Sequence, residues 1–299
     1  MKTVSVIMPT YNKGARLALT LTSFCYQKTS RQYEIILVDG GETPNLEACR
    51  FRSHLPLEIL RVENLGRSFN RNVGINAAQG ELLVFCDDDL IVEPSFIEEH
   101  CLAHDKTSNC LVHGWKNEIP YVKFFLDPRD PQKGLLGGRQ REISDALKEY
   151  RIGEEQFPEI FDRIHQWGHC LDFLEKNVRH MFAHKIDNYH IPWLASCTAN
   201  MSLPRLLAYE AGLFHESFGL DWGPEDLEFG YRVCRSGATV EDAPGAQNYH
   251  LSHARTDWKP VAQRGFEKFQ QMYPHDQFIA KTAELLLEKS GDIEWFTIA

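Results

Sequence analysis

Residues 81–90, "ELLVFCDDDL", join a short apolar segment to three consecutive aspartates. The apolar part, Leu82–Cys86, has the length and composition of a buried β-strand. The carboxylates of Asp87, Asp88 and Asp89 repel one another, so keeping them together requires a positive partner. Polar residues directly after a buried strand are typical of open α/β sheets, in which ligands bind beyond the carboxyl ends of the strands.

The segments around this stretch alternate between strands and helices. Apolar residues at helical spacing over 17–24 predict one helix, and residues 69–78 predict another, with Ser68 as its N-cap and Gly80 as a stop signal. Further strands are expected at residues 4–8, 34–38, 57–62 and 110–113. This order predicts an α/β fold in which a mostly parallel sheet carries helices on both faces.

Residues 115–192 differ from this alternation. They contain several Pro and Gly residues, followed by apolar residues at helical spacing over 160–181, so we expect a helical insertion or lid. Helices are expected again at residues 204–212, 224–235 and 281–289. We therefore divide the chain into two halves of one α/β unit, residues 1–114 and 193–257, an insertion, 115–192, and a helical tail, 258–299.

The composition excludes several classes of protein. The 299 residues carry a formal net charge of −10, whereas non-specific nucleic-acid binding needs clustered Lys and Arg. No apolar run of about 18 residues is present, and the N-terminal run is too short for a signal peptide, so we expect a cytoplasmic protein. The eight Cys residues contain no CxxC pair, which disfavours a structural zinc site.

Three polar clusters follow expected strands: residues 9–12 ("PTYN"), 39–41 ("DGG") and 87–89. We expect them to converge, because the carboxyl ends of parallel strands meet at one sheet edge. An Asp there can accept hydrogen bonds from a base or a ribose, and two Asp residues two positions apart can hold Mg²⁺ or Mn²⁺ beside a diphosphate. A solvated acidic loop explains one such cluster, but the presence of three favours a ligand site.

Longer stretches resemble inverting glycosyltransferases of family 2, which have the GT-A fold. The resemblance lies in "VSVIMPTYNKGARLALTLTSF", "EIILVDGG" and "NLGRSFNRNVGINAAQGELLVFCDDDL". In the second half, "CTANMSLPR" and "AGLFHESFGLDWGPEDLEFGYRVCRSG" resemble a segment with a WGxED-like motif. Galactosyltransferases, polypeptide GalNAc-transferases and chondroitin-polymerase-type enzymes share that segment. The resemblance covers residues 3–114 and 193–255 and leaves out the insertion.

The resemblance implies a UDP-sugar donor at this sheet edge. The residues that would hold its uracil and ribose, or line it from the following helix, are Pro9, Thr10, Tyr11, Asn12, Asp39, Gly66, Arg67, Asn70, Arg71 and Asn72. Gly40 departs from the family pattern, which often has a second Asp there. Asp87 would contact the ribose or the sugar and Asp89 the metal, while Asp88 would be structural or face the sugar.

The resemblance also implies a catalytic base, because an inverting transfer needs a carboxylate that deprotonates the acceptor hydroxyl. Asp226 matches the family base, and Glu225 is the alternative base or an acceptor-orienting group. Trp222 and Gly223 would bind the acceptor and the sugar. Both carboxylates fall in the first turn of an expected helix, where compensation of the helix dipole, worth about 0.3–1 kcal/mol, is the non-catalytic explanation.

The metal implied by the resemblance would be held by Asp89, Asp87 and His250, with His253 as a possible substitute for His250. Histidine nitrogen suits Mn²⁺ better than Mg²⁺, which mostly takes oxygen ligands, so we expect Mn²⁺ to be favoured.

The resulting expectation is a bacterial hexosyl- or N-acetylhexosaminyltransferase that is metal-dependent and inverting. It would move a sugar from a UDP-sugar to a hydroxyl of a glycan, a peptide or a small natural product. A nucleotidyltransferase of related fold is one alternative, but it would need a richer phosphate-binding loop than Lys13 and Arg16 provide. A non-catalytic UDP-sugar-binding protein is the other alternative, although the expected site residues are all present.

Overall fold

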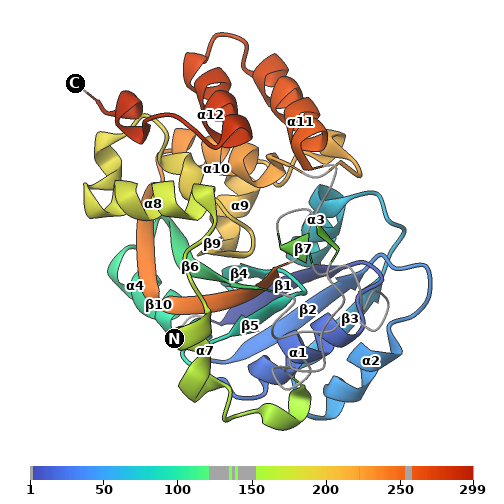
Figure 1. The fold of residues 1–299 in the computed structure, drawn as a ribbon. Helices are drawn as coiled ribbons and strands as arrows, with labels where there is room; N and C mark the ends of the chain where they lie inside the picture. Colours follow the sequence, from blue (N-terminus) through green and yellow to red (C-terminus); the bar gives the residue numbers. More distant parts are fainter. Residues whose placement is uncertain are drawn as a thin grey trace.

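A computed structural model describes residues 3–120, 135–136, 139–140, 153–221, 223–252 and 258–298. In these ranges an eight-stranded sheet has the order β3-β2-β1-β4-β9-β6-β10-β5 (Figure 1). Its strands are β1 Val4–Thr10, β2 Tyr33–Asp39, β3 Leu57–Arg61, β4 Leu82–Cys86, β5 Leu90–Val92, β6 Cys110–Pro120, β9 Asn200–Pro204 and β10 Thr239–Ser252. A separate two-stranded ribbon pairs β7 Leu135–Leu136 with β8 Arg139–Gln140.

All strands of the large sheet except β9 and β5 run in the same direction, which confirms the mostly parallel sheet. The expected strand at 110–113 extends to Pro120 as β6, because it pairs along its length with β10. The boundary expected after residue 114 therefore falls inside a strand. The strands β5, β9 and β10 were not among those expected from the sequence.

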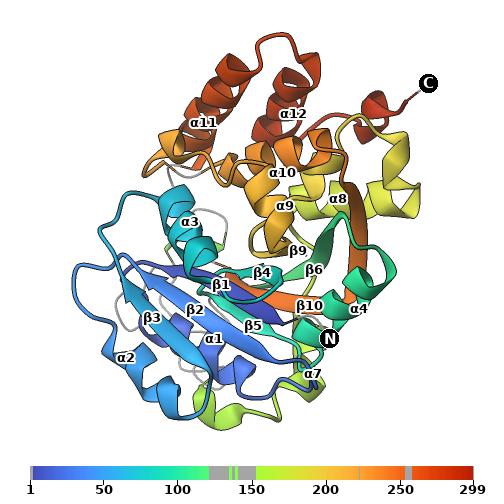
Figure 2. The same cartoon turned by 180° about the vertical axis from the view of Figure 1, so that it is seen from behind.

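Side chains alternate between the two faces of the sheet and build a separate core on each. Ile7 and Phe85 join the cluster that contains Ile75 of α3, whereas Val6 and Met8 join the cluster that contains residues of α1 and α4. The helices are α1 Ala15–Phe24, α2 Leu46–Cys49, α3 Arg67–Ala77, α4 Phe96–Lys106, α7 Phe161–Trp167, α8 Phe173–Ala183, α9 Arg205–Glu210, α10 Glu225–Arg235, α11 Trp258–Met272 and α12 Gln277–Glu288. Figures 1 and 2 show α11 and α12 beyond α10, away from the sheet.

The start of α3 corrects the expected N-cap. The helix begins at Arg67 with Gly66 as its N-cap, so Ser68 lies inside the first turn. Gly66 has φ 113°, and a Cβ on it would lie 1.9 Å from the carbonyl oxygen of Gly219. Both the backbone conformation and this close approach require glycine at the N-cap.

Over residues 160–181 the described chain forms α7 and α8 rather than one continuous helical tract. The chain leaves α7 at Gly168, where a Cβ would lie 2.2 Å from the ring of Tyr249. The next residue, His169, exchanges backbone hydrogen bonds with Glu118 of β6 over 2.8 and 3.1 Å. The segment between α7 and α8 therefore pairs with the sheet. Across the described ranges, no helix is long and apolar enough to cross a membrane.

Candidate functional site

The carboxyl ends of β1, β2 and β4 meet at one edge of the sheet. Thr10 at the end of β1 donates a hydrogen bond from Oγ1 to Asp88 Oδ2 over 2.7 Å. The backbone N–H of Gly40, after β2, donates to the carbonyl of Thr10 over 3.1 Å. A Cβ on Gly40 would lie 3.2 Å from Asn70 Nδ2, so α3 borders the same edge. The three polar clusters that follow these strands are therefore neighbours.

Asp39 organises the loop after β2. It is 1% exposed, its Oδ2 lies 2.8 Å from Arg61 Nη1, and its Oδ1 accepts the N–H of Gly41 over 2.9 Å. In contrast, Oδ1 of the buried Asn70 has no hydrogen-bond partner among the described residues. An unsatisfied buried acceptor is costly in a protein interior, and a ligand that donates a hydrogen bond here would satisfy it.

The three consecutive aspartates have positive partners within the protein. Lys13 Nζ lies 2.8 Å from Asp89 Oδ2 and 3.8 Å from Asp88 Oδ1, and Arg16 Nη1 lies 3.9 Å from Asp89 Oδ2. Asp87 Oδ1 lies 3.7 Å from Arg71 Nη2 of α3. Burial raises the pKa of Asp88 to about 6, although the Lys13 ammonium lowers it. The cluster is thus held by cations from the loop before α1, from α1 and from α3.

His250 reaches Asp89 through the pairing of β5 and β10. Leu90 of β5 is the register partner of His250, and the N–H of Leu251 donates to the carbonyl of Asp89 over 3.0 Å. His250 Nε2 lies 3.5 Å from Asp89 Oδ1, and its Nδ1 lies 2.8 Å from Glu118 Oε2. Burial lowers the pKa of His250, but the carboxylates of Glu118 and Asp89 together raise it to about 10.

The start of α10 supplies a second acidic pair. Glu225 is buried, with Oε1 2.9 Å from Arg71 Nη1 and Oε2 accepting the N–H of Gly223 over 3.2 Å. Asp226 is partly exposed, and its Oδ1 accepts the N–H of Leu227 over 2.9 Å. Desolvation and the neighbouring Glu225 raise the pKa of Asp226 to about 7. Arg71 therefore contacts both acidic clusters, Asp87 on one side and Glu225 on the other.

Comparison with known proteins identifies the family. Residues 5–162, more than half of the chain, match the sequence family described as Glycosyl transferase family 2. The chain belongs to glycosyltransferase family 2.

Two curated relatives illustrate the range of this family. The chain is 29% identical over 262 residues to the glycosyltransferase YfnE of Bacillus subtilis, covering 83% of this chain and 64% of that protein. It is 28% identical over 256 residues to the chondroitin synthase of Escherichia coli, covering 83% of this chain and 34% of that protein. The chain thus spans less than two thirds of the length of these relatives.

Solved structures show the fold of this family 2 member. The mannosyltransferase PcManGT from Pyrobaculum calidifontis, in complex with GDP-Man and Mn²⁺, has a TM-score of 0.60 and 15% identity over 95% of this chain and 70% of that chain. Residues 1–349 of TarS from S. aureus, in complex with UDP-GlcNAc, have a TM-score of 0.56 and 16% identity, covering 99% and 73%. The expected GT-A fold is confirmed.

The remaining expected donor residues of the family 2 pattern lie around the same edge. Pro9 belongs to β1, and Gly66 and Arg67 lie at the start of α3. Tyr11 is 44% exposed and Asn12 has φ 52°, with Asn12 Oδ1 accepting the N–H of Glu42.

Asn72 of α3 has a different environment. Its amide donates to the carbonyl of Phe214 over 2.9 Å and to Glu216 Oε1 over 2.8 Å, while its Oδ1 accepts the N–H of Phe214. Asn72 is therefore occupied in holding α3 to the segment before α10. Two other expected residues, Trp222 and His253, lie outside the described residues. Gly223, next to Trp222, has φ 128°.

The donor set at Asp89 and His250 fits a divalent cation. Within the described ranges, no group of three or more His, Cys, Asp or Glu side chains is arranged to hold a metal. Asp89 Oδ1 and His250 Nε2 are nevertheless 3.5 Å apart, within the separation of about 3.0–3.6 Å expected for neighbouring ligands of one cation. Ligand oxygens and water would complete such a site. Asp87, the other expected metal ligand, has its Oδ1 3.7 Å from Arg71 Nη2, and its side chain is 38% exposed.

Three residues at the site were not assigned to it from the sequence. Lys13 and Arg16 stood out only as cations near the N-terminus, and their contacts with Asp89 depend on how α1 follows β1. Glu118 lies outside every motif and meets His250 across 132 positions of sequence. The pairing of β6 with β10, in which Glu118 and His250 are register partners, is the only signal that could have found it.

Proposed function

We propose that this chain is a metal-dependent, inverting glycosyltransferase that moves a sugar from a UDP-sugar to an acceptor hydroxyl. The observation that carries the proposal is the position of Arg71 between two acidic clusters. Its guanidinium lies 3.7 Å from Asp87 at the end of β4 and 2.9 Å from Glu225 at the start of α10. Arg71 therefore links the expected donor-binding edge to the helix that carries the expected base.

The donor would occupy the edge formed by β1, β2 and the start of α3. Thr10, Asp39 and Asn70 border this edge, and the buried Oδ1 of Asn70 offers an acceptor to a donor N–H or hydroxyl. Lys13, Arg16 and Arg71 supply positive charge for the diphosphate. TarS in complex with UDP-GlcNAc and PcManGT with GDP-Man support a nucleotide-sugar donor, and the family 2 resemblance favours uridine over guanosine.

A divalent cation would be held by Asp89 and His250, with Mn²⁺ favoured because one ligand is an imidazole nitrogen. When bound, such a cation neutralises the diphosphate and acts as a Lewis acid on the leaving group. The Mn²⁺ in the PcManGT complex supports this assignment. Lys13 Nζ and His250 Nε2 both contact the Asp89 carboxylate.

Asp226 would act as the base. A pKa of about 7 lets its carboxylate accept the acceptor hydroxyl proton near neutral pH. As it loses its proton to Asp226, the acceptor hydroxyl oxygen attacks the anomeric carbon on the face opposite the UDP leaving group. This attack inverts the configuration. Glu225 is already bonded to Arg71 and to the Gly223 N–H, so it would orient the acceptor side of the site and hold Arg71. The insertion, residues 115–192, would shape the pocket for a glycan, peptide or small hydroxyl-bearing acceptor.

UDP release from a panel of UDP-sugars tests this proposal, with Mn²⁺, with Mg²⁺ and with EDTA. We expect turnover with at least one UDP-sugar, more with Mn²⁺ than with Mg²⁺, and a product of inverted anomeric configuration by NMR. Thermal shifts report binding independently, since a ligand that binds the native state raises its melting temperature. A shift with GDP and Mn²⁺ but none with UDP and Mn²⁺ would overturn the donor assignment.

A further inference from the structure

Glu118 lies beside His250 on the neighbouring strand. The two residues are register partners in the parallel pairing of β6 with β10, and Glu118 Oε2 lies 2.8 Å from His250 Nδ1. This contact leaves His250 Nε2 facing Asp89. When a metal displaces the Nε2 proton of such a histidine, a carboxylate that keeps accepting the Nδ1–H holds the ring in the tautomer whose Nε2 lone pair binds the metal.

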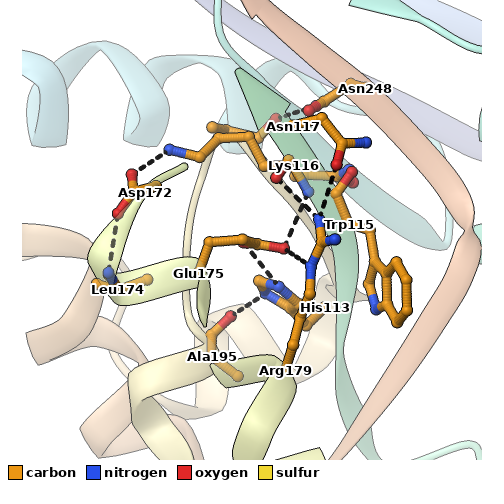
Figure 3. A network of polar contacts seen from close by, with 12 residues as sticks. His113, Trp115, Lys116, Asn117, Asp172, Leu174, Glu175, Arg179, Ala195 and Asn248 are labelled. Carbon is orange, nitrogen blue, oxygen red and sulfur yellow. Dashed lines mark hydrogen bonds and ion pairs between the residues drawn. The ribbon is translucent and has the colours of Figure 1, made fainter. Parts of the chain in front are cut away.

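Glu118 is itself held from the insertion. Its other carboxylate oxygen, Oε1, lies 3.3 Å from Lys116 Nζ, and the same ammonium lies 2.7 Å from Asp172 Oδ2. Asp172 is the N-cap of α8, where its Oδ1 accepts the N–H of Leu174 over 2.9 Å. Figure 3 shows Lys116 extending from β6 to Asp172 at the start of this helix. The backbone of Glu118 is also fixed, by its paired hydrogen bonds with His169.

We propose that Glu118 is a positioning residue that orients His250 toward the metal, and that Lys116 and Asp172 hold Glu118 in place from the insertion. This inference rests on the proposed metal site. It makes the start of α8 part of the support of that site, although α8 contributes no expected metal ligand. Disturbing this chain of contacts should weaken metal binding without removing any ligand.

The competing explanation is that these contacts only dock the insertion onto β6. A separate network already does this. Glu175 of α8 is buried and lies 3.2 Å from His113 Nε2 and 2.8 Å from Arg179 Nε, and the Lys116 N–H donates to it over 3.1 Å (Figure 3). Arg179 in turn donates to the Lys116 carbonyl over 2.9 Å. Docking of α8 therefore does not require Glu118, and the two roles can be separated by experiment.

The test measures Mn²⁺ affinity directly, by the EPR signal of free Mn²⁺, with and without UDP. Glu118→Ala should weaken Mn²⁺ binding about 10–100-fold, as is typical when a partner of a metal-bound histidine is lost. Glu118→Gln should recover part of this loss, because its amide oxygen still accepts a hydrogen bond from Nδ1. Glu118→Gln also keeps the shape of the side chain, so its Mn²⁺ affinity can be measured even if Glu118→Ala folds poorly.

Two further variants test the link to the insertion. Asp172→Asn retains a good N-cap but removes the charge that holds Lys116, so Mn²⁺ binding should weaken several-fold. Glu294→Gln is the matched control, because Glu294 bonds His180 on α8 from the C-terminal segment, away from β6. It should leave the Mn²⁺ affinity unchanged.

A double variant tests whether Glu118 acts through His250. If it does, Glu118→Ala should add little to the loss caused by His250→Ala, whereas independent effects would add. Equal Mn²⁺ affinity in wild type and Glu118→Ala, or full additivity, would overturn the inference while leaving the metal site intact. Absence of Mn²⁺ binding in the wild type would overturn the proposed metal site, and the inference with it.

Discussion

The two acidic clusters of the site differ in how their charge is compensated. Among the described residues, Asp88 and Asp89 contact Lys13, Arg16 and His250, whereas Glu225 is paired with Arg71, whose charge also acts on Asp226. Burial and the neighbouring Glu225 raise the pKa of Asp226 to about 7, and Arg71, which pairs directly with Glu225, only partly opposes this rise. Asp89, which is paired with Lys13, Arg16 and His250, is suited to lie beside a cation and a diphosphate, while the desolvated Asp226 carboxylate is suited to take a proton.

The largest expected effect is the fall in kcat when the base is removed. Asp226→Asn keeps the size of the side chain but cannot accept the proton, so kcat should fall about 10²–10⁴-fold. Binding of UDP with Mn²⁺ should stay within a few-fold of wild type in calorimetry, because Asp226 belongs to the other cluster. Turnover equal to wild type would remove Asp226 as the base. Loss of UDP binding would mean that the two clusters are not separate.

The second prediction concerns the compensated cluster. Lys13→Met removes the ammonium 2.8 Å from Asp89 and leaves that buried carboxylate without this partner, so the metal-free protein should lose about 1–3 kcal/mol of unfolding free energy. Mn²⁺ can take the place of that charge, so the variant should gain more stability from Mn²⁺ than wild type does. Thermal melts with EDTA and with Mn²⁺ measure both values.

A control for this variant is Lys259→Met, which breaks an exposed pair with Glu288 over 2.8 Å. Exposed pairs contribute little, so its melting temperature should change only slightly, and equally with and without Mn²⁺. If Lys13→Met melts like this control, Lys13 does not compensate Asp89 in the metal-free protein.

The central strands of the sheet could be predicted from the sequence, whereas β10 could not. β4 occurs at Leu82–Cys86 as expected, and β1 and β2 extend the expected segments, because strands buried on both faces read as continuous apolar runs. β10 was not expected, because its sequence mixes apolar and charged residues and contains Pro244 and Gly245 at an irregularity in the pairing.

The residues of the site also differ in whether the sequence alone could predict them. The positions of Asp89 and Asp226 follow from motifs that are local in sequence. The pairing of Glu118 with His250 depends on the register of two distant strands, and the contact of Lys13 with Asp89 depends on two loops meeting. No local pattern contains either contact, because the first is fixed by long-range strand pairing and the second by the approach of two loops that are distant in sequence.

The charge of Glu225 should influence the pKa of its neighbour Asp226. Glu225→Gln removes a negative charge that raises the pKa of Asp226, and it frees Arg71, which lowers that pKa. In wild type, kcat should rise with pH as Asp226 deprotonates around pH 7. In the variant this rise should move to lower pH. Asp221→Asn, which alters an exposed pair with Arg264, should leave the pH profile unchanged.

If the pH profile of Glu225→Gln overlays that of wild type, Glu225 does not set the pKa of Asp226. A movement to higher pH would contradict the proposed direction of the coupling. Glu225 raises the pKa of Asp226, while Arg71 and the N–H groups of Leu227 and Thr198 lower it.

The smallest predicted effect is on stability, and its sign follows from linkage. The pKa of Asp226 is about 7 in the folded protein and near 3.8 when the chain is unfolded. The folded state therefore holds the proton more tightly, so Asp226 favours folding at low pH and lowers stability as the pH rises from about 4 to 7. Asp226→Asn removes this dependence.

The Asn variant should accordingly melt a few degrees above wild type at pH 8, and the difference should shrink toward pH 5. Differential scanning calorimetry across this range measures it, with Glu288→Gln as a surface control whose difference from wild type stays small at both pH values. A variant less stable than wild type at pH 8 would mean that the Asp226 carboxylate is well compensated in the folded protein. The contrast between the two clusters would then be lost, because both would hold their charge without cost.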